Sequence, residues 1–137
     1  MQLSNPKQVL NLDDFLPSDG EDRIEMYFMD GDLSLDILYE IEDSEPRSAK
    51  CRVHFYYAKY FFKTPFPGYS FFSCPDDRKL SLLNSLVEYE HSDMVEMDGV
   101  TSRTKGYKHY RLFLHTTGVA IHVVAESCKI SNEELIG

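Results

Sequence analysis

The amino-acid sequence predicts an α+β fold, with an antiparallel β-sheet of about five strands and one or two helices packed on one face. Two segments of alternating apolar residues, each interrupted by a glycine turn, predict β-hairpins at 23–41 and 109–130. CRVHFYYA at 51–58 predicts a further strand, and RKLSLLNSLVEYE at 78–90 has the apolar spacing of a helix. With 137 residues, of which 42% are apolar, the chain suits a single domain over 1–137.

The first element in sequence order is a predicted short helix. Ser4 or Asn5 would cap it and Pro6 would occupy its first turn, where a missing N–H costs nothing. The apolar residues of VLNL at 9–12 continue the helix, which should end before Pro17. PSDGED at 17–22 has the composition of a loop.

RIEMYFMDGDLSLDILYEI at 23–41 predicts a hairpin with a two-residue turn at Asp30-Gly31, because such turns need positive φ at both positions. This register opposes Phe28 to Leu33 and places the apolar side chains of both strands on one face. The opposite face is acidic and sets Glu25 directly across from Asp36, an arrangement of like charges that is destabilising. That face carries Glu25, Asp32, Ser34, Asp36, Glu40 and Glu42.

The middle of the chain mixes turn signals with aromatic residues. KYFFKTPFPGYSFF at 59–72 is predicted to be an aromatic loop, because Pro65, Pro67 and Gly68 break it. SCPD at 73–76 has the residues of a helix start and leads into the predicted helix at 78–90. SDMVEMDG at 92–99 fits either a short helix or a strand, and GVTSRTKGYK at 99–108 is a basic loop.

The C-terminal hairpin allows two turns. A two-residue turn at Thr117-Gly118 pairs Leu114 with Ile121 and keeps a uniform apolar face, whereas a three-residue turn would move His122 to the other face from His115. The two-residue turn is preferred because it sorts the apolar residues onto one side. The opposite face then gathers His109, Arg111, Phe113, His115, His122 and Glu126.

The net charge of −9 lies entirely in the first 50 residues, which hold 13 acids and 4 bases, whereas residues 51–137 hold 10 of each. Such a field attracts cationic partners and repels phosphate backbones, so a nucleic-acid partner is not expected. The alternative is that the charge only keeps the protein soluble.

Neither a membrane span nor a secretory signal is expected. The longest apolar runs are too short to cross a bilayer, and MQLSNPKQVLNLDDFLP at the N-terminus lacks the basic and apolar regions of a signal peptide. The chain has three widely spaced cysteines, Cys51, Cys74 and Cys128. An odd number of cysteines without a signal favours reduced thiols and a cytoplasmic location.

The acidic face of the first hairpin has three interpretations. Glu25 and Asp36 are close enough to serve as paired carboxylates, but sugar hydrolysis also needs a cleft, and the sequence contains no tryptophan. DGDLSLDILYEI is not a calcium loop, because Gly31 falls at its second position instead of its sixth and the closing glutamate is missing. Two interpretations of the acidic face therefore remain: a docking face for a basic partner, or an ordinary solvated surface.

The histidine-containing face of the C-terminal hairpin is the best catalytic candidate. His109, His115 and His122 could exchange protons near neutral pH, and Arg111 could hold a phosphate, which would suit a metal-independent ribonuclease. The alternative is that these histidines lie on exposed strands without a role. Tight metal-ligand spacings such as HExxH are missing, so no metal or cofactor is expected. Cys74 near a helix start could have a lowered pKa, although a packed or capping thiol is favoured.

KHYRLFLHTTGVAIHVVAESCKI at 108–130 resembles the last strand pair of small cytosolic immunity proteins from bacterial contact-dependent or polymorphic toxin systems. In those proteins an RHYRIYF-like strand leads through a turn to a VIAES-like strand. The resemblance covers 23 of the 137 residues, and Thr116 and Thr117 stand where that family has acidic turn residues. It implies a stoichiometric inhibitor, without chemistry of its own, that binds a toxin domain and blocks its active site.

The sequence therefore leads to one hypothesis and two alternatives. The chain is expected to be an acidic, non-enzymatic inhibitor of a cognate toxin domain with a basic surface, because nucleases that bind phosphate present basic clefts. The alternatives are a small hydrolase that uses the histidine-containing face, and a phage-encoded acidic inhibitor of a host nuclease. Aromatic loop residues would anchor the partner. The predicted contact residues are Glu25, Asp32, Asp36, Glu40, Glu42, Phe66 and Tyr69.

Overall fold

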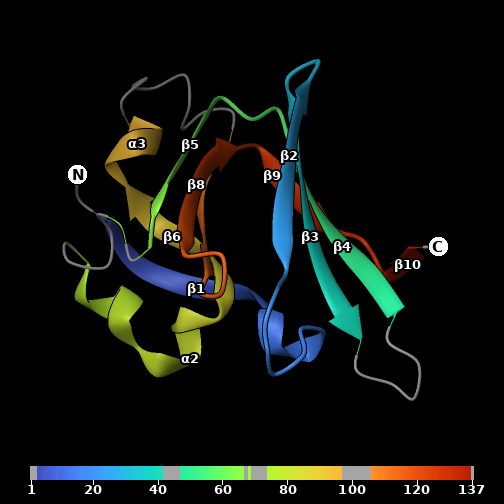
Figure 1. Cartoon of the computed structure of the whole chain (residues 1–137). Coiled ribbons are helices and arrows are strands. Elements are labelled where there is room, and N and C mark those ends of the chain that lie inside the picture. The colour runs from blue at the N-terminus through green and yellow to red at the C-terminus, as the bar shows by residue number, and fades with distance from the viewer. Residues whose placement is uncertain (1–2, 42–46, 67, 69–73, 97–105, 137) are drawn as a thin grey trace.

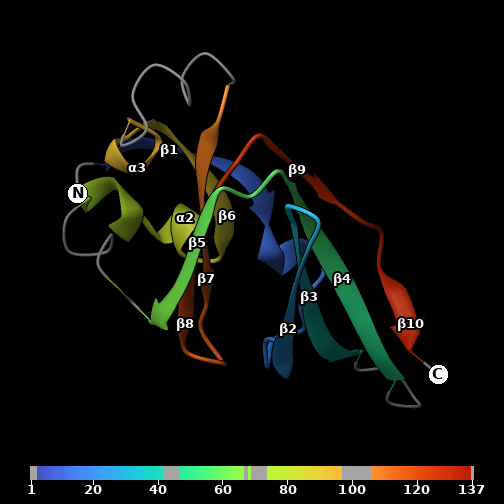
Figure 2. The same cartoon turned by 90° about the horizontal axis from the view of Figure 1, so that it is seen from above.

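In the computed structural model the chain forms two antiparallel sheets that pack face to face (Figures 1 and 2). The structure describes residues 3–41, 47–66, 68, 74–96 and 106–136. Sheet A contains, in spatial order, β1 (Leu3–Asn11), β6 (Ser85–Ser92), β7 (Lys108–Leu114), β8 (Val119–Ala125) and β5 (Tyr60–Pro65). Sheet B contains β10 (Glu134–Ile136), β4 (Arg47–Tyr56), β3 (Asp32–Ile41) and β2 (Arg23–Met29), and β9 (Ser127–Ile130) also pairs with β4.

The described helices are single turns. They are the 3-10 helices η1 (Leu12–Asp14) and η2 (Pro75–Arg78) and the α-helices α2 (Leu80–Leu83) and α3 (Asp93–Glu96). The α+β prediction therefore holds only broadly, because the helices are small and the strands form two sheets instead of one. Within the described part of the chain, no helix has the length and apolar character needed to cross a membrane.

The main core lies between the two sheets, as expected when each sheet has one apolar face. Its buried side chains come from both layers. They include Leu33, Leu35, Ile37, Val53 and Phe55 from sheet B, and Leu86, Tyr110, Leu112, Leu114, Ile121, Val123 and Ala125 from sheet A.

Sheet A is also covered on its second face. A separate buried cluster joins Val87 and Tyr89 of β6 to Leu82 of α2, with Leu3 and Cys74 beside them. The strands β7 and β8 are therefore buried on both sides over most of their length, and β8 (VAIHVVA) is accordingly apolar at nearly every position instead of at alternate ones.

The first hairpin is confirmed in its predicted register. Met26 pairs with Leu35 and Phe28 with Leu33, and Glu25 lies opposite Asp36. Asp30 and Gly31 form the turn with φ values of 54° and 87°, as a two-residue hairpin turn requires.

The C-terminal hairpin has the predicted faces but a different register. Leu114 pairs with Val119, so the loop spans four residues, His115 to Gly118, and neither the two-residue nor the three-residue turn is correct. The slip from the predicted pairing is two residues. Because side chains alternate with a period of two, the slip leaves every residue on its predicted face.

Three segments differ from prediction. Residues 3–11 form the strand β1 instead of a helix, and Pro6 is tolerated because β1 is an edge strand. The predicted helix at 78–90 is cut short at Leu83, and β6 begins at Ser85. The predicted aromatic loop contains the strand β5, which pairs with β8. The stretch at 92–99 was compatible with either a short helix or a strand, and α3 forms over Asp93–Glu96 within it.

Candidate functional site

The histidine-containing face of the C-terminal hairpin is buried. His109, Arg111 and His122 are each at most 1% exposed, because η2 and α2 pack on this side of sheet A. His115 is separate from them: it is exposed, and its Nε2 lies 2.8 Å from the carbonyl oxygen of Leu83. The predicted catalytic grouping is therefore not assembled at a surface, and the three buried side chains cannot meet a substrate in this conformation.

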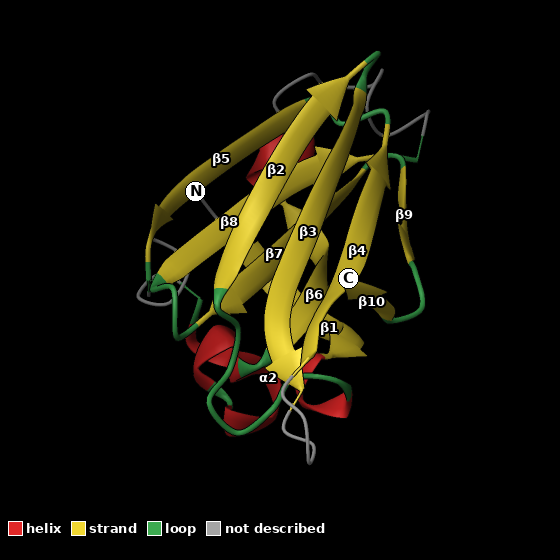
Figure 3. Ribbon diagram, turned by 45° about the vertical axis from the view of Figure 1, so that its right-hand side comes forward, coloured by secondary structure: helices red, strands yellow, loops and turns green. Residues whose placement is uncertain are grey.

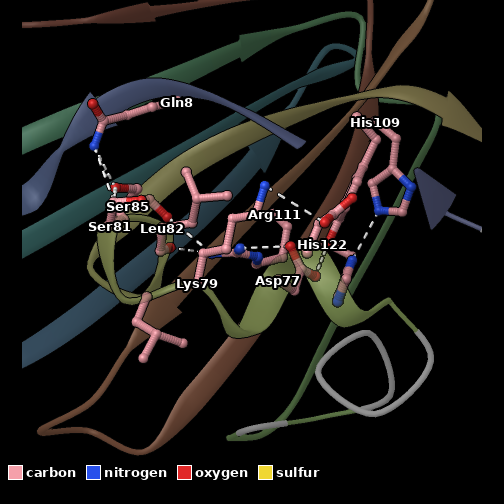
Figure 4. A network of polar contacts seen from close by, with 12 residues as sticks. Gln8, Asp77, Lys79, Ser81, Leu82, Ser85, His109, Arg111 and His122 are labelled. Carbon is pink, nitrogen blue, oxygen red and sulfur yellow. Dashed lines mark hydrogen bonds and ion pairs between the residues drawn. The ribbon is translucent and has the colours of Figure 1, made fainter. Parts of the chain in front are cut away.

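Arg111 forms a buried ion pair at the centre of this face (Figure 4). Its guanidinium donates to Asp77 Oδ1 over 2.7 Å and to the carbonyl oxygens of Leu82 and Ser85 over 3.1 and 3.2 Å. Tyr89 donates its hydroxyl to the other carboxylate oxygen of Asp77. These bonds fasten the turn of η2 and α2 onto sheet A, and removing one partner of such a pair costs about 3–5 kcal/mol.

The two buried histidines form a short chain of ring nitrogens beside this ion pair (Figure 4). Ser92 Oγ lies 2.5 Å from His109 Nδ1, and His109 Nε2 lies 2.8 Å from His122 Nδ1. Burial, with the nearby positive charge of Arg111, lowers the pKa of His122 to about 4. The pKa of His109 is lowered well below its usual value by burial and by its neighbours His122 and Arg111. Both rings are therefore neutral near pH 7 and act as structural hydrogen-bonding groups.

The acidic face of the first hairpin is largely neutralised by β4. Asp36 is only 3% exposed and forms a two-point ion pair with Arg52, over 2.6 and 2.9 Å. A carboxylate buried in this way is poorly placed to contact a partner, which corrects the expectation for Asp36, and the positive charge of Arg52 offsets part of its repulsion with Glu25. Asp32 is half-buried, lies 3.1 Å from His54 Nε2 and accepts the backbone N–H of Tyr57.

The other predicted contact residues are placed differently from one another. Glu25 is half-buried and accepts hydrogen bonds from Arg23 and Tyr27, whereas Glu40 is exposed. Phe66 is half-buried and packs its ring on Phe113 and His115, so it is not a free anchor. Glu42 and Tyr69 lie outside the described residues.

A group of exposed carboxylates gathers at one end of the molecule, around η1, the loop that follows it and the end of β3. We call this set the acidic end. All five of its carboxylates are exposed, and none forms an ion pair with another residue of the described chain. Its members are Asp13, Asp14, Asp19, Asp22 and Glu40.

A groove of about 370 Å³, lined by both polar and apolar side chains, opens beside the acidic end. Leu80 of α2 forms part of its wall with 87% of its surface exposed. A smaller hollow of about 60 Å³, lined by Asp19, Asp22 and Glu40, shares Pro17 and Gly20 with the groove. The groove and the carboxylates therefore form one continuous surface. The groove is lined by Leu12, Asp13, Leu16, Pro17, Ser18, Gly20, Glu21, Leu80, Leu83, Asn84, Phe113, His115 and Thr116.

The loop at 17–22, which carries Asp19 and Asp22, is held against the turn between β7 and β8. Glu21, only 2% exposed, accepts the backbone N–H and the hydroxyl of Thr117 over 2.9 and 3.2 Å. Thr116 donates its hydroxyl to the carbonyl oxygen of Asp19 over 3.1 Å. These contacts join a loop and a turn that are far apart in sequence. They fix the position of the loop and therefore of Asp19 and Asp22.

A second exposed surface lies at the tip of the first hairpin. Phe28 and Phe61 pack their rings 5.3 Å apart although they are 54% and 40% exposed, and Met29 and Tyr57 are exposed still further. The backbone N–H of Tyr57 donates to the carboxylate of Asp32, and that of Ala58 donates to the carbonyl oxygen of Gly31, which holds these residues together. We call Tyr27, Phe28, Met29, Tyr57 and Phe61 the aromatic tip.

One cluster in the described chain has the donor types of a metal site. His91, Asp93 and Glu96 bring ligand atoms to within 4.8 Å of one another. The two carboxylates, however, approach opposite nitrogens of the His91 ring, at 3.9 and 3.5 Å, and all three side chains are more than 40% exposed. This geometry fits ion pairs with a protonated histidine, and a shared ion would need the side chains to rotate.

The thiols are poorly reactive. Burial raises the pKa of Cys51 to about 11, and it also raises the pKa of Cys128. The pKa of Cys74 is raised by burial and by the charge of Asp77, contrary to the lowering that a helix start would produce. Cys74 is therefore a packed thiol, as favoured from the sequence.

Sequence reasoning missed most of this site. The acidic end combines the η1 turn, the loop at 17–22 and the end of β3, which approach one another only after both sheets form. The composition of the PSDGED loop was the available signal, since it places three acids within six residues beside Asp13 and Asp14. The His91 cluster was visible as an H-x-D-x-x-E spacing.

Comparison with known proteins finds no family model, curated protein or solved structure that matches the chain. The functional argument therefore rests on the geometry and charge of the described surfaces.

Proposed function

We propose that this protein is an acidic, immunity-type inhibitor that binds a partner protein, a nuclease toxin, and covers its basic active-site cleft. The observation that carries the proposal is the acidic end, in which five exposed carboxylates without ion-pair partners among the described residues adjoin the groove that Leu80 borders. Charge of one sign steers a partner of the opposite sign, and the exposed apolar side chain of Leu80 at the groove wall offers the contact that would hold the complex.

The charge assignment differs from the one expected from the sequence. Glu40 stays in the proposed contact surface, joined by Asp13, Asp14, Asp19 and Asp22. Asp36 is left out because it is buried against Arg52. Leu80 replaces Phe66 as the apolar anchor, because its side chain is almost fully exposed at the groove wall. The burial of His109, Arg111 and His122 gives the alternative of a hydrolase on this face no support.

Co-expression with the product of the adjacent gene tests the proposal. The tagged protein should co-purify with that product as a one-to-one complex in native mass spectrometry, and its dissociation constant should rise with salt. The partner should degrade nucleic acid when alone and lose that activity in the complex. Purification of the tagged protein without this partner, or with a partner that stays active when bound, would refute the proposal.

Charge reversal then locates the contact surface. Asp19→Lys with Glu40→Lys should weaken the complex at least tenfold, chiefly by slowing association, because both side chains belong to the unpaired set. Glu90→Lys with Glu126→Lys is the matched control, since both are exposed elsewhere and both double variants change the net charge from −9 to about −5. Equal losses in the two double variants would show a general charge effect and contradict the assignment to the acidic end.

A further inference from the structure

The free edge of β2 differs from the other sheet edges of the described chain. An exposed strand edge presents unpaired N–H and C=O groups to any other strand, and proteins block such edges with proline, lysine, bulges or short strands. β1 has Pro6, Lys7 and a register irregularity between Gln8 and Leu10. β5 has Lys63 and Pro65, and beside β4 the strands β9 and β10 are only four and three residues long.

β2 has no proline, lysine or bulge and is not short, and its two charged side chains, Arg23 and Glu25, pair with each other. It is seven residues long and pairs with β3 in an unbroken register. It ends the spatial order of sheet B, and Figure 3 shows it lying along the front of the molecule. Every residue of β2 is half-buried or exposed. An edge of this kind is suited to accept another strand.

The turn at Asp30-Gly31 determines which backbone groups point outward. In a hairpin with a two-residue turn, the residues that flank the turn, Met29 and Asp32, exchange hydrogen bonds with each other. The pattern alternates along the strand, so Glu25 and Tyr27 also bond to β3. The N–H and C=O groups of Ile24, Met26 and Phe28 therefore face the open edge.

The charges that flank β2 decide between two occupants. A second copy could pair its own β2 antiparallel around Met26, because this register matches all three open residues of each copy. The same register would set Asp22 of one copy opposite Asp30 of the other, and like charges across strands are destabilising. Both aspartates are exposed and without ion-pair partners in the described chain, so a strand with basic residues is the better fit.

We propose that β2 is a strand-addition site, at which a basic, extended segment of the partner protein joins sheet B. The inference deepens the proposed function, because it takes the basic character of the partner from it. β2 begins directly after Asp22 of the acidic end and ends at Met29 of the aromatic tip. An added strand would therefore contact carboxylates at one end and exposed rings at the other, and backbone pairing between them would fix its register.

A defined peptide tests the inference without the natural partner. The probe is a capped seven-residue peptide of alternating lysine and valine, titrated into the ¹⁵N-labelled protein. We expect the amide signals of Ile24, Met26 and Phe28 to shift most, and their hydrogen exchange to slow in proportion to the fraction bound. The same peptide with glutamate in place of lysine should not bind, because it brings negative charge to Asp22 and Asp30.

Two variants at one position separate backbone pairing from side-chain contact. Met26→Pro removes an outward N–H without breaking the ladder to β3, and it should weaken peptide binding at least tenfold. Met26→Ala keeps that N–H and should change binding less than threefold. Circular dichroism and thermal unfolding establish that both variants fold. If Met26→Pro does not fold, the hydrogen exchange of the outward backbone amides, measured in Met26→Ala with and without the peptide, tests backbone pairing instead.

Three results would overturn the inference: no peptide binding at millimolar concentration, binding that shifts signals away from β2, or equal binding by the Met26→Pro and Met26→Ala variants. A failure of the strand-addition inference can be told apart from a failure of the proposed inhibitor function. A salt-sensitive one-to-one complex in which Ile24, Met26 and Phe28 keep fast exchange would support the inhibitor and refute strand addition.

Discussion

At the scale of single residues, the same side chains that suggest catalysis in the sequence serve structure in the fold. Arg111 of β7 pairs with Asp77 of η2 and so joins the helical turn to sheet A, and His122 of β8 bonds to His109 beside this ion pair. The pKa of His122 is lowered by this burial, so its ring stays neutral where a free histidine would take up a proton. Protonation of the buried histidines at low pH should therefore destabilise the folded protein.

The stability should therefore fall on mild acidification. Because the pKa of His122 is about 4 when folded and 6.5 in its ordinary state, lowering the pH below 6.5 protonates the unfolded chain first and favours unfolding. We expect His122 alone to lower the free energy of unfolding by about 2 kcal/mol between pH 7 and pH 5. Urea unfolding at several pH values measures this loss.

Two variants check the assignment. His122→Gln should lose part of the pH dependence, whereas His115→Gln, which changes an exposed ring, should keep all of it. A His122→Gln protein whose stability falls as steeply as that of the wild type would contradict the role of this residue.

At the scale of elements, the loop at 17–22 depends on a close approach to the turn between β7 and β8. Gly20 has a φ of +78°, and a Cβ atom there would lie 2.2 Å from Thr116 Oγ1. Gly31 has a similar φ of +87° but open space around it. The two glycines therefore separate the effect of contact from the effect of backbone conformation.

Gly20→Ala should cost more than Gly31→Ala. We expect about 1 kcal/mol from the positive φ at either position, and a further 1–2 kcal/mol at Gly20 because Thr116 must rotate and give up its bond to Asp19. Urea unfolding of both variants gives the comparison. Adding Thr116→Ala to Gly20→Ala should recover much of the excess, and equal losses for the two glycine variants would rule out the close contact.

The elements also show where sequence patterns are sufficient. The register of the first hairpin follows from Asp30-Gly31, because a two-residue turn leaves one pairing that buries Leu33 and Leu35 together. The C-terminal hairpin lacks such a turn, so its register was missed while its faces were predicted. Leu83, Leu86 and Val87 fit a helical stripe as well as a strand buried on both faces, so β6 could not be told from a helix. The acidic end depends on contacts between distant segments, which periodicity does not encode.

At the scale of the whole molecule, the excess negative charge is not spread evenly. β4 supplies Arg52 and His54 to the acidic face of the first hairpin, whereas the acidic end has no ion pairs within the described chain. Because like charges repel, we expect the carboxylates of the acidic end to destabilise the free protein. A basic partner would remove this cost when it binds.

Salt should stabilise the free protein. We expect the midpoint of thermal unfolding to rise between about 20 and 200 mM sodium chloride, because ions screen the unpaired carboxylates. Asp19→Lys with Glu40→Lys should reduce this rise more than Glu90→Lys with Glu126→Lys. Scanning calorimetry at two salt concentrations makes the measurement, and an equal reduction in both double variants would place the repulsion elsewhere.

The pairing of strands that are distant in sequence has a consequence for folding during synthesis. β2, β3 and β4 follow one another and can pair as soon as they leave the ribosome, but β1 must wait for β6, and β5 for β8. Until β7 and β8 are made, the apolar side of sheet B, with Leu35 and Phe55, has no opposing layer. The nascent chain should therefore fold late and slowly, as chains with high contact order do, and should depend on chaperones until its last strands emerge.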